Sequence, residues 1–316
     1  MPSSAKLMVT ADQLAIGDVP ADAPCLFVES HDSGFRHEEV MLPACPLIAI
    51  GDRSGVAAKY ADVVVPNAKS AEAILESIGS NPATAQVIVE LLRLLQNLPC
   101  EEGLVAESMA YGLLQGSSEH LAWLDQSRGE GTRNGAGSVQ TTRDSDSLHI
   151  QLDRPEADNA IDRTMRDNLA EAFQLAALDD SITKVTLLAA GRSFSLGAEL
   201  SEFGTTRDPA LAHQIRRRTL PAIWALRCGE KLETHVQGAC VGAGLEIAAF
   251  SKRLTAGTRA WFQLPELRMG LLPGAGGSVS LSRRIGRQRT AELILTGKRL
   301  SAREALGWGL IDEILD

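Results

Sequence analysis

Residues 236–246 contain the feature that most restricts the fold of this chain, a strand pattern that passes through a glycine-rich turn into an apolar helix. The turn at 242–244 reads Gly-Ala-Gly, and residues 194–198 form a second turn of this kind. The first N–H groups of a helix lack partners within the helix and carry partial positive charge. Such turns can therefore stabilise a developing oxyanion, although each one alone is also explained as a junction where glycine relieves crowding.

Strand and helix patterns alternate from residue 148 to residue 316. Strand patterns occupy 148–152, 184–190 and 232–236, and residues 165–178 have the apolar periodicity of a helix. This alternation predicts an α/β architecture.

The first 127 residues are predicted to form a small α/β layer followed by packed helices. The short apolar runs at 25–29, 47–50 and 62–65 are strand candidates. A helix is predicted from Pro82 and ends at Pro99. The buried face of a second helix is predicted to carry four apolar residues, Leu104, Met109, Leu113 and Leu114.

The composition changes most sharply at 128–147, where Gly, Ser, Thr and Asp replace any apolar period. We expect three parts: an N-terminal α/β and helical extension at 1–127, a flexible linker at 128–147, and a catalytic domain at 148–316. The 316 residues are enough for two domains by length alone.

Charge and cysteine usage argue against several classes of function. With 31 basic and 40 acidic side chains, the net charge is −9, so we expect no nucleic-acid partner. The five cysteines are scattered without metal-ligand spacing, so we expect no metal site, no disulfide framework and a reducing compartment. The sequence has no apolar run of about 18 residues, so we expect a cytoplasmic protein without a membrane partner.

Two glutamates stand among apolar residues and are candidate catalytic groups. Glu246 lies on the first turn of the apolar helix, and Glu266 follows Leu264 and Pro265. A carboxylate in such surroundings is costly to bury unless it is hydrogen-bonded, paired or protonated. The structural alternatives are stabilisation of Glu246 by the helix dipole and an ion pair between Glu266 and Arg268.

Residues 148–316 resemble the crotonase, or enoyl-CoA hydratase/isomerase, superfamily. The matching segments are 152–155 (Leu-Asp-Arg-Pro), 159–160 (Asn-Ala), 195–198, 242–246, 264–266 and 270–277. The resemblance implies a spiral of ββα units that binds acyl-CoA thioesters and forms an enolate-type intermediate. It also implies an oxyanion hole made by the N–H groups of Ala198 and Ala243, with Glu246 and Glu266 holding a water molecule between them.

The resemblance implies further properties. It implies that six residues bind the substrate, namely Asn159, Ala160, Gly197, Glu199, Leu200 and Gly242. It implies fatty acid metabolism as the setting, no cofactor besides the CoA of the substrate, and a homo-oligomer of three or six chains. Two carboxyl groups in one small site cannot easily both ionise, so one serves as acid and the other as base.

Two departures from the family pattern keep other functions open. Glu199 stands where the family usually has Asp, and the helices that usually follow the segment 301–315 are expected to be missing. The alternatives are an enoyl-CoA isomerase, a cofactor-independent aryl-acetyl-CoA dioxygenase, which carries a comparable helical extension, and a non-catalytic acyl-CoA binding or scaffold protein. The dioxygenases have Gln at the position of Glu246, which favours hydration here.

Overall fold

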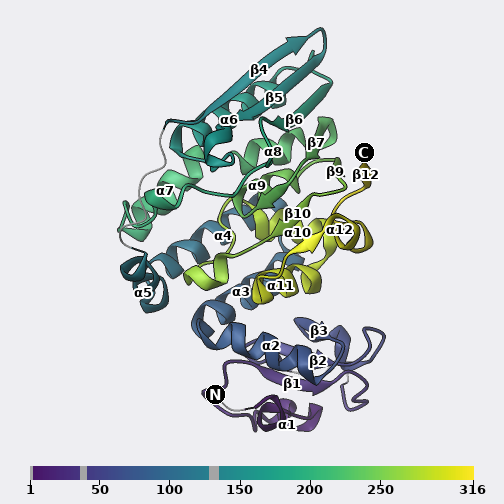
Figure 1. The fold of residues 1–316 in the computed structure, drawn as a ribbon. Coiled ribbons are helices and arrows are strands. Elements are labelled where there is room, and N and C mark those ends of the chain that lie inside the picture. Colours follow the sequence, from purple (N-terminus) through teal and green to yellow (C-terminus); the bar gives the residue numbers. More distant parts are fainter. Residues whose placement is uncertain (1–2, 36–40, 128–134) are drawn as a thin grey trace.

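The computed structural model describes residues 3–35, 41–127 and 135–316 (Figure 1). A six-stranded sheet has the order β12-β9-β7-β6-β5-β4, and all neighbours are parallel except β4 and β5. Its strands are β4 (Ser138–Asp144), β5 (Ser147–Asp153), β6 (Lys184–Ala189), β7 (Leu232–Val236), β9 (Arg253–Gly257) and β12 (Glu313–Leu315). Leu148, Ile150 and Leu152 of β5 alternate inward, as a half-buried strand requires.

A second sheet of three strands, β11-β10-β8, positions the candidate site. Its strands are β8 (Ala239–Val241), β10 (Trp261–Gln263) and β11 (Leu300–Ser301). The chain runs from β7 of the larger sheet through β8 into helix α9 (Ala243–Ala248), and from β9 through β10 into the short helix η7 (Glu266–Met269). These repeats form a spiral of ββα units, so the α/β fold expected from the sequence is confirmed.

Helices cover the sheets of this C-terminal part. They are α6 (Arg163–Leu178), α7 (Pro209–Thr219), α8 (Ala222–Cys228), α10 (Gly277–Ile285), α11 (Arg287–Thr296) and α12 (Ala302–Trp308). The Asp162 side chain caps α6 by accepting the N–H of Met165 at 2.9 Å. Short 3₁₀ helices are η1 (Ser4–Leu7), η2 (Ala57–Lys59), η3 (Leu95–Asn97), η4 (Pro155–Ala157), η5 (Leu200–Glu202) and η6 (Gly229–Lys231).

The N-terminal region begins with a parallel sheet, β1 (Leu26–Glu29), β2 (Leu47–Ile50) and β3 (Val63–Val65), which confirms the three predicted strands. Its helices are α1 (Ala11–Ile16), α2 (Ala68–Gly79), α3 (Pro82–Leu94), α4 (Cys100–Gln115) and α5 (Ser118–Gln126). The three strands are almost wholly buried, as a parallel sheet covered on both faces requires.

The N-terminal helices pack directly on the C-terminal part, with α4 against α7 and α10, and α2 and α3 against α11 (Figure 1). Buried Asp62 forms ion pairs with Arg93 of α3 and Arg287 of α11, each at 2.5 Å. One hydrophobic core therefore contains residues from both sides of position 127. The N-terminal extension predicted at 1–127 therefore shares this core with the C-terminal part.

Two local expectations need correction. The flexible linker predicted at 128–147 is wrong for residues 138–144, because they form β4 and pair with β5; residues 128–134 lie outside the described residues. The predicted apolar face of α4 is wrong for Met109 and Leu113, which are 61% and 66% exposed. Docking of α4 on α7 and α10 buries the opposite side of the helix, which includes Glu107.

Two further features of the described residues concern the cysteines and the length of the helices. The five cysteines are free thiols. None of the helices within 3–35, 41–127 and 135–316 has the length and apolar character needed to cross a bilayer.

Candidate active site

The two glycine-rich turns lie against each other at the edge of the small sheet. Ser195 bridges to Cys240 of β8, and Ala198 bridges to Ile161. Gly197 has a φ of 92°, and a Cβ placed there would lie 3.1 Å from the Val241 carbonyl oxygen and 3.6 Å from the Ala243 nitrogen. Only glycine permits both this backbone conformation and this approach.

The backbone N–H groups of Ala198 and Ala243 remain free to bind a ligand. Ile161 pairs with the residues on either side of Ala198, since its N–H donates to Gly197 and its carbonyl accepts from Glu199. The Ala198 N–H therefore points to the other side of the segment. Ala243 is the first residue of α9, where helical geometry offers no acceptor. Within the described ranges, neither N–H has a hydrogen-bond partner.

Glu246 is held rigidly by the loop that precedes α10. Its Oε2 accepts the N–H groups of Ala275 at 2.6 Å and Gly277 at 2.8 Å. The side chain is 2% exposed, and this burial raises the pKa of Glu246 while the backbone N–H donors partly oppose the rise. A Cβ at Gly277 would lie 2.4 Å from the Glu246 Cγ, so the loop can pass this closely only because residue 277 is glycine.

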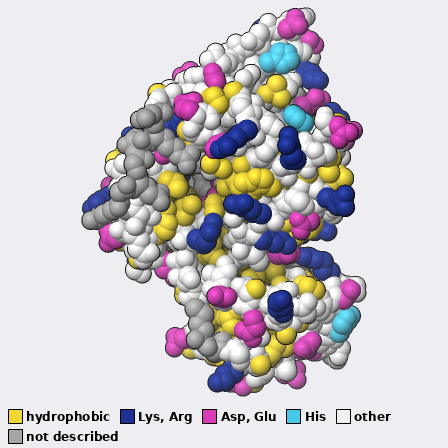
Figure 2. Space-filling view, viewed as in Figure 1, with side chains coloured by type: hydrophobic (Ala, Val, Ile, Leu, Met, Phe, Trp, Pro, Cys, Tyr) yellow, Lys and Arg dark blue, Asp and Glu magenta, His cyan; other side chains and the backbone are white. Residues whose placement is uncertain are grey.

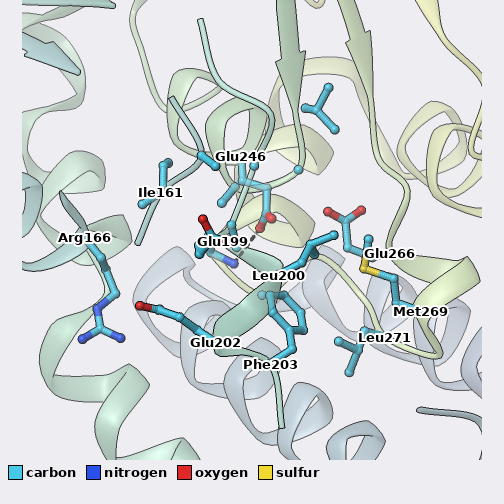
Figure 3. Close-up of a pocket in the computed structure, with 18 of the residues that line it drawn as sticks. Ile161, Arg166, Glu199, Leu200, Glu202, Phe203, Glu246, Glu266, Met269 and Leu271 are labelled. Carbon is cyan, nitrogen blue, oxygen red and sulfur yellow. Dashed lines mark hydrogen bonds between the residues drawn. The ribbon is translucent and has the colours of Figure 1, made fainter. Parts of the chain in front are cut away.

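The Glu266 carboxyl group differs from that of Glu246 in its hydrogen-bond partners. Its Oε2 is buried without a hydrogen-bond partner in the part of the chain that the structure describes. Burial raises the pKa of Glu266 well above its usual range, and the nearby Glu246 charge raises it further. Figure 3 shows the carboxyl groups of Glu246 and Glu266 in the same pocket. The ion pair with Arg268, considered above as the structural alternative for Glu266, is not among the contacts of the described residues.

A cavity of about 960 Å³ joins the two turns and both glutamates. Of the expected site residues, it is lined by Ala198, Ala243, Ala160, Gly197, Glu199, Leu200, Gly242, Glu246 and Glu266. Five arginines also line it, namely Arg163, Arg166, Arg216, Arg268 and Arg299. On the face drawn in Figure 2, basic side chains surround hydrophobic ones near the middle of the molecule.

Asn159 and Glu199, two of the residues implied in substrate binding, both have protein groups as hydrogen-bond partners. Asn159 is fully buried and does not line the cavity; its amide donates to the carbonyls of Ala190 at 2.7 Å and Ser193 at 2.9 Å. Glu199 reaches the cavity wall, but its Oε2 pairs with Arg154 at 3.0 Å and its Oε1 accepts from Ser201. Both side chains therefore hold the first turn in place.

Helix α4 supplies two residues that were not expected from the sequence. Glu107 is 2% exposed, and burial, followed by the neighbouring Glu246, raises its pKa. Tyr111 lines the cavity one helical turn further on, and the Arg216 guanidinium lies 4.5 Å from its ring centroid. The sequence carries no signal for Glu107, because Met109 and Leu113 predict the opposite side of this helix as the buried one.

Comparisons with known proteins show which family the chain resembles. The family model described as enoyl-CoA hydratase/isomerase matches residues 143–316. The chain belongs to this family. The chain is 33% identical over 169 residues to the 2,3-dehydroadipyl-CoA hydratase of Escherichia coli K12, covering 53% of this chain and 65% of that protein. It is 34% identical over 182 residues to the probable mitochondrial enoyl-CoA hydratase 2 of Arabidopsis thaliana, covering 54% and 56%.

A solved enoyl-CoA hydratase/isomerase family structure shows the same fold. The putative enoyl-CoA hydratase/isomerase of Mycobacterium abscessus matches with a TM-score of 0.52 and 34% identity, covering 57% of this chain and 71% of that chain. The chain thus spans less than two thirds of the length of the two curated relatives named above. Glu107 and Tyr111 lie outside the range that the family model matches.

Proposed function

We propose that the protein is an enoyl-CoA hydratase that adds water across a 2-enoyl-CoA double bond. The observation that supports this most is the contrast between two buried carboxyl groups on one cavity: Glu246 accepts two backbone N–H groups, whereas Glu266 Oε2 has no partner among the described residues. Donors to a carboxylate favour its charged form, and burial without donors favours the protonated form. Glu246 is therefore the base and Glu266 the acid in the direction of hydration.

The thioester carbonyl is proposed to bind between the N–H groups of Ala198 and Ala243. Glu246 takes a proton from water while the water oxygen bonds to the β-carbon, and the electron pair of the double bond moves towards the thioester oxygen. The two N–H groups stabilise this enolate-type charge, and each is worth about 10²–10³ in rate. Glu266 then donates its proton to the α-carbon, so one water molecule is added and no oxidant is needed.

Acyl-CoA as the substrate class has separate support. Arg268 and Arg299 line the cavity, and neither forms an ion pair with any of the carboxylates in the described residues. Arginine without a protein carboxylate suits the phosphates of CoA. The relative from Escherichia coli is named for a dicarboxylic enoyl-CoA, so the substrate panel should include one beside crotonyl-CoA. The cytoplasmic location, the role in fatty acid metabolism and the homo-oligomeric state stay predictions.

The test follows the loss of the conjugated thioester absorbance of enoyl-CoA substrates. Wild-type protein is expected to hydrate at least one of them, and Glu266→Gln is expected to lower kcat by about 10²–10⁴ while ligand affinity is kept. Glu233→Gln serves as the control, because Glu233 lies on β7 and pairs with Lys184 outside the cavity. Double-bond migration without hydration would favour an isomerase. Oxygen uptake with an aryl-acetyl-CoA would favour a dioxygenase, and binding of acyl-CoA without turnover would favour a scaffold protein.

A further inference from the structure

Four consecutive backbone N–H groups at the start of α10 are shared alternately by two buried glutamates. Ala275 and Gly277 donate to Glu246 Oε2. Gly276 donates to Glu107 Oε1 and Ser278 donates to Glu107 Oε2, both at 2.7 Å. One carboxylate comes from α9 beside the small sheet and the other from α4, which precedes it by more than a hundred residues. The loop 275–278 is therefore fixed from two sides.

Glu107 lies behind the acid pair rather than in the large cavity. It is absent from the lining of that cavity, and it lines a small neighbouring cavity together with Arg216 and Arg217 of α7. The charged or titratable groups that face this region are Glu246 of α9, Glu266 of η7, Arg216, Arg217 and His213 of α7, and Tyr111 of α4 itself.

The other helices packed on α4 carry groups with partners of their own. On α5, Glu119 accepts from Thr84 of α3, and His120 bonds the Met269 carbonyl. Arg227 of α8 pairs with Glu101 at the beginning of α4. Arg93 of α3 pairs with Asp62. Among the carboxylates near α4, Glu246 is therefore the one that accepts N–H groups from the same loop, 275–278, as Glu107.

We propose that Glu107 is a positioning residue for the acid pair, because it clamps the loop 275–278 onto Glu246. This inference rests on the proposed hydratase function. If Glu107 no longer holds the loop, the Gly276 and Ser278 N–H groups are left unpaired in a buried site. The loop then no longer fixes Glu246, and the Ala275 and Gly277 N–H groups, which lower the pKa of the base, are displaced from it.

The test compares Glu107→Gln with Glu102→Gln, a change on the exposed side of the same helix. In Glu107→Gln, kcat is expected to fall about 10- to 100-fold through misplacement of Glu246. The rising limb of kcat/KM against pH is expected to move to higher pH, because the displaced Ala275 and Gly277 N–H groups then lower the pKa of Glu246 less. KM is expected to stay near the wild-type value. The proposal would be overturned if kcat falls in Glu107→Gln without a shift of the rising limb of kcat/KM, or if its kcat and pH profile equal those of Glu102→Gln.

Glu107→Asp tests the reach of the side chain and serves if Glu107→Gln does not fold. It keeps two acceptor oxygens but is shorter by one methylene group, so it holds the Gly276 and Ser278 N–H groups less closely. The kcat of Glu107→Asp is therefore expected to fall while KM stays near the wild-type value. A Glu107→Asp protein with the wild-type kcat would overturn the proposal.

A measurement without substrate distinguishes failure of this inference from failure of the proposed function. The pKa of Glu107 is about 8 in the folded chain and about 4.3 in an unfolded one. Folding therefore binds a proton between these values, and stability declines as pH rises from about 5 to about 8. Urea unfolding is expected to show a shallower decline in Glu107→Gln. If wild-type protein hydrates no enoyl-CoA, the hydratase proposal fails. A shallower decline of stability with pH in Glu107→Gln would still support the role of Glu107 in holding the loop. A decline as steep as that of wild-type protein would overturn that role.

Discussion

Replacing Gly242 with alanine tests whether the second turn requires a bare backbone. Gly242 has a φ of 48° and a ψ of −127°, a combination that residues with a Cβ avoid. A Cβ placed there would lie 2.8 Å from Glu266 Oε1 and 3.7 Å from the Gly197 Cα. The added methyl group must therefore displace the Glu266 carboxyl or the backbone that carries the Ala243 N–H.

The two consequences of Gly242→Ala can be measured separately. Backbone strain costs about 1–3 kcal/mol, so urea unfolding is expected to show a loss of that size. Misplacement of one oxyanion donor lowers kcat by about 10²–10³, which initial rates of enoyl-CoA hydration would show. Displacement of Glu266 would add to this loss.

Gly286→Ala is the matched control for Gly242→Ala. Gly286 also has a positive φ, of 80°, but a Cβ there would meet no atom within 4 Å. It is expected to lose a similar amount of stability and to keep its kcat. A folded Gly242→Ala protein with the kcat of Gly286→Ala would refute the reasoning.

Two further predictions concern pH and the packing of the N-terminal region. The pKa of Glu246 is about 7, and that of Glu266 is well above its usual range. The value of kcat/KM is therefore expected to rise with pH through about 7 as Glu246 ionises, and to fall at higher pH when Glu266 loses its proton. A flat profile of kcat/KM between pH 5 and 9 would contradict this prediction. Asp62→Ala leaves Arg287 unpaired and is expected to lower the free energy of unfolding in urea by about 3–5 kcal/mol. The control Asp179→Ala removes an exposed ion pair and is expected to lower it by about 1 kcal/mol or less. Equal losses of stability in the two variants would contradict the buried pairing.

Local patterns in the sequence were enough to predict six of the strands, β1, β2, β3, β5, β6 and β7, and the positions of the two turns along the chain. The runs at 25–29 and 47–50 are continuous and apolar, as buried parallel strands are. The turns at 194–198 and 242–244 combine small residues with strand ends, so their role as strand-to-helix junctions follows from neighbouring residues. The confirmed elements are those whose environment is decided within a short segment.

Long-range packing decided the features that were not predicted. Strand β4 has no apolar alternation and is mostly exposed, so its conformation depends on pairing with β5. Met109 and Leu113 gave α4 an apparent apolar face, yet the docking of α7 and α10 buries Glu107 instead. The partners of Glu107 are backbone N–H groups far along the chain, which side-chain periodicity cannot reveal.

The most direct test of the proposed site is a crystal structure with a bound acyl-CoA thioester that is not turned over, such as a saturated analogue. The thioester oxygen is predicted to lie about 2.7–3.1 Å from the nitrogens of both Ala198 and Ala243, with its α- and β-carbons facing Glu266 and Glu246. A thioester bound elsewhere in the cavity, or either N–H paired with the chain's own carbonyl groups in the complex, would contradict the proposal.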